Sequence, residues 1–198
     1  MSQIAPRTKR QMADETRQRL LDAADRLCRA SGPMAMSLDA VAAAAGLSKG
    51  GLLYHFPSKH ALLRALVEHH VTAFTGEMDA RTPDWRRAEG AAALAAVRVY
   101  LSVTRTMMLQ TEATAAGIFA ALTEDPLFMT PLLALRSEIR ALFGRCPPEA
   151  MLLFLASEGI FHDQLIDPEG WSPAQASADL DRLTAVLDRI ETAAASPA

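Results

Sequence analysis

Apolar side chains recur at the spacing of an α-helix along almost all of the 198 residues, and this periodicity is what most constrains the fold. Between residues 20 and 28, for example, they fall at i, i+1, i+4, i+7 and i+8, which is one face of a helix. We find no convincing alternation of apolar and polar side chains, the pattern typical of a half-buried strand. The sequence therefore predicts an all-α fold of about nine helices.

Glycine, proline and hydroxyl residues mark where these helices begin and end. Ser31-Gly32-Pro33 predicts the end of the first helix, and Ser37, Ser48 and Ser58 are typical N-caps for the next three. Longer helices are expected at about 86–109, 113–122, 131–143 and 149–165. The run Ser172-Pro173-Ala174-Gln175 predicts the start of the last one, as a capping box with proline at the first helical position.

The break at residues 45–48 separates the second and third short helices, which is a helix-turn-helix pattern. Gly46 tolerates the positive φ that such a turn needs, and Leu47 is the candidate to pin the turn to the core. In this motif the second helix lies in the major groove of DNA. We therefore expect a DNA-binding part at residues 1–62 and a second functional part at residues 63–198.

The run SLDAVAAAAGLSKGGLLYHFPSK, residues 37–59, resembles the N-terminal signature of the TetR family of bacterial regulators. The resemblance covers about residues 14–70. Gly51 and Leu53 stand where the family often has Thr or Ser and Tyr, at positions that face DNA in the family, so they bear on which bases are read. The positions in register are Gly46, Ser48, Lys49, Gly50, Leu52, His55, Phe56, Pro57, Ser58, Lys59 and Leu62.

Chemistry suggests how the residues around this motif would hold DNA. Helix N-termini bind phosphate groups, Lys and Arg side chains contact the DNA phosphate backbone, and glycines let a recognition helix approach the DNA closely. The alternative is that the glycines merely start a helix and the aromatic residues are core, which we adopt for Phe56. The arm with Arg7, Lys9 and Arg10 either adds contacts or is plainly disordered. The predicted DNA-binding residues are Ser37, Ser48, Lys49, Gly50, Gly51, Leu53, Tyr54, His55 and Lys59.

Charge is distributed unevenly along the chain, although the net charge is only −3. Residues 1–70 carry ten Lys and Arg against six Asp and Glu, or +4, and residues 71–198 carry ten against seventeen, or −7. A basic N-terminal part with an acidic remainder fits nucleic-acid binding at one end, while a solvated charged surface would look the same.

The family resemblance also implies that the last two helices form a four-helix interface in a homodimer, which would recognise a near-palindromic operator. The segment 151–156 is apolar all round, as expected of a helix buried on two sides. The predicted interface residues are Leu155, Leu180, Leu183, Leu187 and Ile190.

Polar residues that interrupt the apolar runs of residues 105–162 are candidates to line an effector pocket. Glu158 and His162 share a helix face, and a satisfied intrahelical pair or plain exposure are the alternatives to ligand contact. The predicted pocket residues are Arg105, Met108, Glu112, Phe119, Glu158 and His162.

Several function classes lack their sequence signals. Cys28 and Cys146 suffice neither for a zinc site nor for a disulfide framework, so we expect no metal and no cofactor. His162-Asp163 resembles a metal-binding HD dipeptide but lacks the spaced partner histidines that such a site needs, and no nucleophile elbow or phosphate loop is present. The N-terminus lacks the apolar core of a secretory signal, and no uninterrupted apolar run reaches roughly 18 residues, so we expect a cytoplasmic protein without a membrane partner.

The sequence thus predicts a DNA-binding transcriptional regulator and not an enzyme, with repression relieved by a small-molecule effector. The alternative is a helical small-molecule-binding or scaffolding protein that kept the fold without specific DNA binding.

Overall fold

The computed structural model describes residues 8–110, 126–167 and 170–195. Within these ranges the chain forms eight α-helices and two short 3-10 helices and has no strand, so the predicted all-α class is confirmed. The elements are α1 (Lys9–Ala35), α2 (Leu38–Ala44), α3 (Lys49–His55), α4 (Lys59–Arg81), η1 (Trp85–Arg87), α5 (Gly90–Gln110), η2 (Pro126–Met129), α7 (Thr130–Phe143), α8 (Ala150–Ile166) and α9 (Pro173–Ala195).

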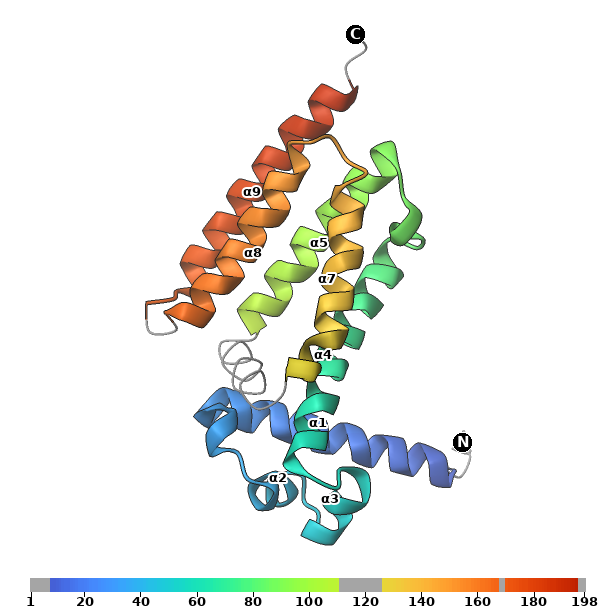
Figure 1. Cartoon of the computed structure of the whole chain (residues 1–198), viewed down its shortest axis with the longest axis vertical. Coiled ribbons are helices and arrows are strands. Elements are labelled where there is room, and N and C mark those ends of the chain that lie inside the picture. The colour runs from blue at the N-terminus through green and yellow to red at the C-terminus, as the bar shows by residue number, and fades with distance from the viewer. Residues whose placement is uncertain (1–7, 111–125, 168–169, 196–198) are drawn as a thin grey trace, which may run out of the picture.

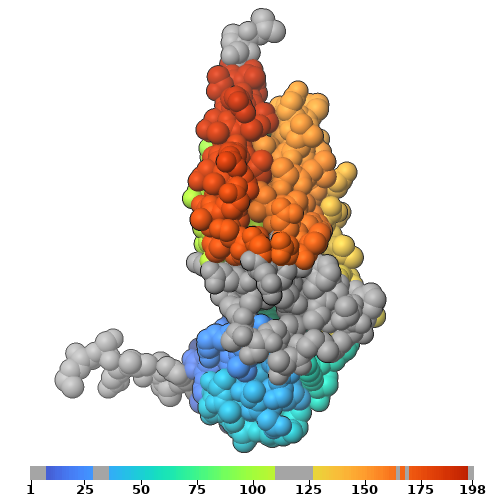
Figure 2. Space-filling model, turned by 90° about the vertical axis from the view of Figure 1, so that its left-hand side faces the viewer, coloured from blue at the N-terminus to red at the C-terminus, as the bar shows by residue number. Residues whose placement is uncertain are grey.

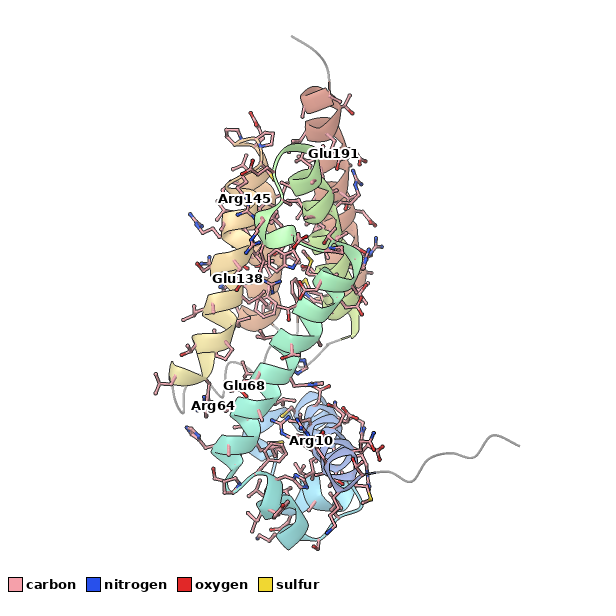
Figure 3. All side chains as sticks on the ribbon, turned by 90° about the vertical axis from the view of Figure 1, so that its right-hand side faces the viewer. Arg10, Arg64, Glu68, Glu138, Arg145 and Glu191 are labelled. Carbon is pink, nitrogen blue, oxygen red and sulfur yellow. The ribbon has the colours of Figure 1, made fainter. Side chains whose placement is uncertain are left out.

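The helices form two parts of different shape. Helices α1 to α3 gather around the first turns of α4 at one end, with α1 running across the long axis of the molecule (Figure 1). The rest of α4 packs with α5, α7, α8 and α9 into an elongated bundle (Figure 1). Arg64 and Glu68, an i,i+4 pair joined at 3.1 Å from Nε to Oε1, lie on α4 where it passes from one part to the other (Figure 3).

Each part has its own hydrophobic core. The N-terminal core is built from side chains between Leu20 and Leu66, together with Phe128. The core of the bundle is built from side chains between Met78 and Ile190. Because Leu66 belongs to the first core and Met78 to the second, the boundary between the two parts falls within α4.

The serine N-caps are confirmed at the starts of α2, α3 and α4. The backbone N–H of Ala40, of Gly51 and of Ala61 donates to the hydroxyl of the serine three residues earlier, at 3.1, 3.1 and 3.0 Å. At α9 only half of the predicted capping box forms: Gln175 N–H donates to Ser172 Oγ at 3.4 Å, while its side chain bonds Asp179 instead.

Two expected boundaries are wrong. Helix α1 continues to Ala35 through the Ser-Gly-Pro run that predicted its end. Pro33 lacks the N–H that would donate to the carbonyl of residue 29, but it lies in the last turn of α1, with only two helical residues after it, so it costs the helix little beyond that one bond. The helix expected from about residue 86 begins at Gly90, after η1, and the helix expected at 113–122 lies outside the described residues.

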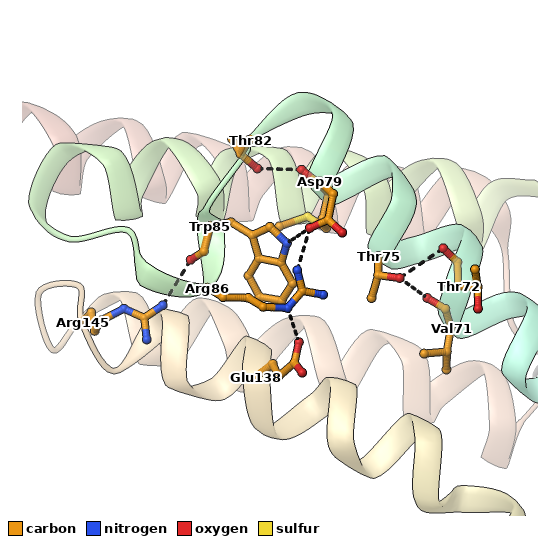
Figure 4. Close-up of polar contacts among 10 residues, drawn as sticks. Val71, Thr72, Thr75, Asp79, Thr82, Trp85, Arg86, Glu138 and Arg145 are labelled. Atoms are coloured by element: carbon orange, nitrogen blue, oxygen red, sulfur yellow. Dashed lines mark hydrogen bonds and ion pairs between the residues drawn. The ribbon is translucent and has the colours of Figure 1, made fainter.

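A cluster around Trp85 explains why the chain turns before α5 begins. Trp85 is fully buried, and its indole N–H donates to Asp79 on α4 at 2.7 Å (Figure 4). The Arg86 guanidinium lies 4.3 Å from the centre of the Trp85 ring and bridges Asp79 to Glu138 on α7, at 2.6 and 2.7 Å. Arg145 donates to the Trp85 carbonyl at 3.2 Å. These contacts tie the α4–α5 turn to α7 at the end of the bundle away from α3 (Figure 1).

Helix α5 is apolar enough to raise the question of a membrane. By length and composition alone its stretch Gly90–Leu109 could cross a bilayer, although charged residues interrupt it and so hid it from a search for uninterrupted apolar runs. In the fold this helix packs against α4, α7 and α9 and supplies much of the core of the bundle. Burial among other helices accounts for its composition.

Candidate functional site

The turn between α2 and α3 has the geometry that the sequence predicts. Gly46 adopts a φ of +67°, and the N–H groups of Gly46 and Leu47 donate back to carbonyls of α2 at 3.0 and 2.9 Å. The Arg19 guanidinium of α1 donates to the Ala45 carbonyl and so closes the end of α2. A Cβ on Gly46 would lie 3.4 Å from Arg19 Nη2, an ordinary van der Waals contact, so the positive φ and not a lack of space favours glycine there.

Helix α3 is anchored on one side and open on the other. Leu52 is fully buried, and Phe56 at the C-cap is 2% exposed, both in the N-terminal core, while Leu47 packs against the same core from the turn. Tyr54, by contrast, is 83% exposed. Since Leu52 and Phe56 are four residues apart, they hold one face of α3 inward and leave the face with Tyr54 to solvent.

The predicted DNA-binding residues fall on or beside this open face. Ser37, Ser48, Lys49 and Gly50 are exposed, and Leu53 is 37% exposed. Gly51, His55 and Lys59 are half-buried. The two serine hydroxyls already accept a backbone N–H as caps, but each keeps its own O–H, which can donate to a phosphate.

Lys49 forms an ion pair within the protein, which the sequence alone did not predict. Its Nζ lies 3.0 Å from Asp39 on α2, and the two side chains are 57% and 67% exposed. An exposed pair of this kind contributes only about 0–1 kcal/mol. Lys49 can therefore exchange Asp39 for a phosphate at a small cost in free energy. Lys49 and Asp39 are ten residues apart on different helices, so helical spacing in the sequence does not indicate their pairing.

Two of the residues predicted for the effector pocket, Arg105 and Glu158, form ion pairs with other helices. Arg105 contacts Asp181 and Ser177 on α9, and Glu158 contacts Arg136 on α7. A charged group loses less hydration free energy in a partly exposed ion pair than in an apolar interior. His162 is exposed, and its Nδ1 lies 2.6 Å from the Glu158 carbonyl oxygen.

The remaining pocket predictions divide between buried and undescribed residues. Met108 is buried, at 4% exposure. Glu112 and Phe119 lie outside the described residues.

A cluster of hydroxyl groups lies instead between α5 and α8. The Tyr100 hydroxyl and Ser157 Oγ are 3.0 Å apart, and Ser157 donates onward to the Phe154 carbonyl at 2.8 Å. Burial raises the pKa of Tyr100 to about 12, which its hydrogen bond with Ser157 partly offsets. One turn along α5, the Thr104 hydroxyl is buried beside Tyr100, and hydrogen bonding with Thr104, like that with Ser157, acts to lower the pKa of Tyr100. The only sequence signal was the i,i+4 spacing of two hydroxyl residues in an apolar helix.

The residues predicted for the dimer interface differ in their exposure within the subunit. Leu180, Leu187 and Ile190 are buried in the chain's own cores or helix contacts, at 9% exposure or less, and Leu183 is half-buried. Leu155 is 49% exposed.

Helix α8 carries further exposed apolar side chains on the same face as Leu155. Leu152 is 65% exposed and Ile166 is 78% exposed, at positions that fall with Leu155 and His162 along one side of the helix. Helices α8 and α9 lie side by side on one broad face of the molecule, in orange and red (Figure 2). Hydrophobic periodicity does not single out Leu152 and Ile166, because apolar residues occur on every side of α8.

The titratable groups in the described ranges do not assemble a metal site. No group of three or more His, Cys, Asp or Glu side chains there could hold an ion. Cys28 and Cys146 are free thiols, and burial raises the pKa of Cys28 to about 11, which disfavours the reactive thiolate.

Two family models match the chain, on either side of the boundary within α4. Residues 20–66 match the bacterial regulatory proteins of the tetR family, and residues 94–188 match the tetracyclin repressor-like C-terminal domain. The chain belongs to the TetR family. Its N-terminal match contains the turn at Gly46 and the whole of α3, so this TetR-family transcriptional regulator carries the DNA-binding helix-turn-helix of its family.

Solved structures share the fold at low identity. The fatty acid degradation regulator FadR from Bacillus halodurans has 12% identity and a TM-score of 0.63, over 87% of this chain and 94% of that one. A transcriptional regulator from Rhodococcus sp. Rha1 has 19% identity and a TM-score of 0.63, over 87% and 96%. The multidrug binding protein EbrR, complexed with malachite green, has 24% identity and a TM-score of 0.59, over 84% and 96%. No curated protein matches the sequence.

Proposed function

We propose that this TetR-family protein is a homodimeric repressor that holds a near-palindromic operator with one α3 from each subunit and releases it on binding a small-molecule effector. The observation that carries the proposal is the exposure of Tyr54. An aromatic side chain that is 83% exposed, on a helix whose opposite face is buried, has no role in the chain's own core. Contact with a base edge or phosphate gives it one.

The surroundings of Tyr54 have the chemistry of a DNA surface. Lys49 provides a cation, and the Ser37 and Ser48 hydroxyls provide donors at helix N-termini. Gly50 presents bare backbone at the start of α3, which permits a close approach to the groove. Gly51, Leu53, His55 and Lys59 complete the proposed interface around it.

The face of α8 supports the second part of the proposal, a two-fold dimer. Leu152, Leu155 and Ile166 expose apolar surface that a partner subunit would cover. A helix of seven residues such as α3 reads few base pairs, so specific binding needs two copies. Leu183 on α9 is half-buried against the core of the bundle, and Leu180, Leu187 and Ile190 support this face from inside the subunit.

The effector site is proposed for the C-terminal part, residues 63–198, with residues 1–62 as the DNA-binding domain. Tyr100, Thr104 and Ser157 would offer polar contacts in an otherwise apolar interior, with the buried Met108 one turn beyond Thr104 along α5. The complex of EbrR, a protein of the same fold, with malachite green supports a small-molecule effector. We further propose that the protein acts in the cytoplasm and without catalysis.

The test is a gel shift on the DNA upstream of the protein's own gene, followed by a genome-wide binding selection if that fragment does not shift. Tyr54→Ala and Lys49→Ala are each expected to weaken binding by about tenfold or more, equivalent to ~1.4 kcal/mol. Arg182→Ala removes a 70% exposed cation on α9, far from α3, and should leave affinity unchanged. Equal affinity in all four proteins, or no specific shift on any selected DNA, would favour a scaffolding or binding protein instead.

A further inference from the structure

One side chain from the C-terminal part is built into the core of the DNA-binding part. Phe128, in η2, is 1% exposed and belongs to the N-terminal core. Every other member of that core in the described ranges lies between Leu20 and Leu66. The Phe128 ring lies 4.2 Å from the ring of His60, centre to centre, at the start of α4.

The segment that carries Phe128 is anchored at its other end in the bundle. Helix η2 leads directly into α7, where Leu135, seven residues after Phe128, is buried in the core of the bundle. η2 contacts both α4 and α7, and it lies as a yellow turn beside α4 where that helix leaves the DNA-binding part (Figure 1). Within the described residues the two cores are thus bridged at two places, once along α4 and once through η2.

Two bridges have a mechanical consequence that one would not have. A single helix between two bodies can bend or twist, so the angle between the bodies is weakly determined. A second attachment beside it removes that freedom, because rotating one body would pull a buried phenylalanine out of its core at the full cost of exposing it. The exposed neighbour Leu127 does not share this anchoring position, since it is 74% exposed.

We infer that Phe128 is a positioning residue for DNA recognition: it fixes the angle of the DNA-binding part against the bundle, and thereby the distance between the two α3 helices of a dimer. This rests on the proposed function. The distance between the reading helices sets which half-site spacing the protein accepts. Phe128 therefore contributes to the selection of operator spacing without touching DNA.

The test compares binding of the selected operator with binding of duplexes that have one base pair added or removed between the half-sites. One base pair moves a half-site by about 3.4 Å along the DNA and turns it by about 34°. The wild type is expected to bind the altered duplexes at least about tenfold more weakly. For Phe128→Ala, the dissociation constant for the altered duplex is expected to be within about twofold of that for the selected operator. Phe128→Leu keeps an apolar anchor and is expected to restore most of the wild-type preference for the selected operator.

A matched variant separates positioning from stability. Leu20→Ala weakens the same core from α1, where the side chain is fully buried, but leaves the η2 bridge intact. It is expected to weaken binding to all duplexes alike and to keep the spacing ratio. If Phe128→Ala does not fold, Phe128→Val against Phe128→Leu gives the same comparison, with the smaller side chain giving the smaller ratio.

Two outcomes overturn the inference. If the wild type discriminates between spacings and the Phe128 variants do so equally, Phe128 is an ordinary core residue. If Leu20→Ala relaxes the ratio as far as Phe128→Ala, core integrity and not the bridge sets the angle. A wild type that binds no duplex, or binds all spacings alike, would instead refute the dimeric reading on which the inference rests.

Discussion

Replacement of Gly50 by alanine should move stability and DNA affinity in opposite directions. A Cβ built on Gly50 meets only Ser48 Oγ, at 4.0 Å, which is ordinary van der Waals contact. The folded chain therefore has room for the methyl group, and its backbone does not require glycine. Alanine restricts the unfolded chain and favours helix, so the variant should be more stable by about 0.4–1 kcal/mol. For a chain of this size that raises Tm by roughly 1–4 °C.

On DNA the same methyl group is expected to cost affinity. If the backbone of α3 approaches the groove at Gly50, the methyl enters space that the DNA needs, and a two-fold dimer counts the penalty twice. We expect the dissociation constant for the operator to rise at least about tenfold, or ~1.4 kcal/mol in total. The assays are thermal unfolding and fluorescence anisotropy on labelled operator, performed on the same preparation.

Gly76→Ala provides the control for this prediction. Gly76 lies inside α4, with nothing within 4 Å of its built Cβ, so alanine there gives a similar gain in helix stability. It lies beyond the boundary between the two cores, away from α3, and should leave DNA affinity unchanged. Wild-type affinity in Gly50→Ala would refute the close-approach reasoning, and a lower Tm would refute the argument from space.

Three further variants test other parts of the structure. Leu155→Glu places a charge on the exposed face of α8 in each subunit and should give a monomer by light scattering at micromolar concentration. Leu133→Glu, at a site on α7 that is 55% exposed, should remain a dimer. A monomeric wild type would contradict the proposed interface. Thr104→Val removes a buried hydroxyl beside Tyr100 and should lower stability by about 1 kcal/mol; unchanged or higher stability would mean that this hydroxyl makes no stabilising hydrogen bond. Burial, and secondly the neighbouring His70, lower the pKa of His69 below its usual 6.5, so the unfolded chain takes up this proton at higher pH than the folded one. Stability from this group is therefore full above pH 6.5 and falls as the pH drops below it, and His69→Gln should reduce the loss of Tm on acidification; an unchanged loss would contradict this.

The sequence predicted the helix-turn-helix closely because its signals are local. Each serine N-cap needs only its own hydroxyl and the backbone three residues later, and Gly46 needs only its own φ. Such features are determined within a few residues, so single positions reveal them.

Which face of each C-terminal helix is buried could not be predicted in the same way. Helix α8 is apolar all round, so periodicity could not tell buried Leu153 from exposed Leu152. Periodicity identified Leu180, Leu187 and Ile190 as one apolar edge of α9, but it could not show that this edge packs within the subunit. Arg105 and Glu158 interrupt apolar runs, yet they find partners 76 and 22 residues away, and such pairings depend on tertiary structure.

The most direct test of the central claim is the salt dependence of operator binding by the wild type and by Lys49→Ala. Each phosphate contact adds about 0.9 to the slope of log K against log salt concentration. If each subunit of a dimer places Lys49 on a phosphate, the variant should lose about 1.8 from that slope, while Arg182→Ala loses nothing. A loss of about 0.9 would indicate a single reading head, and an unchanged slope would contradict the assignment of α3 as the DNA-binding helix.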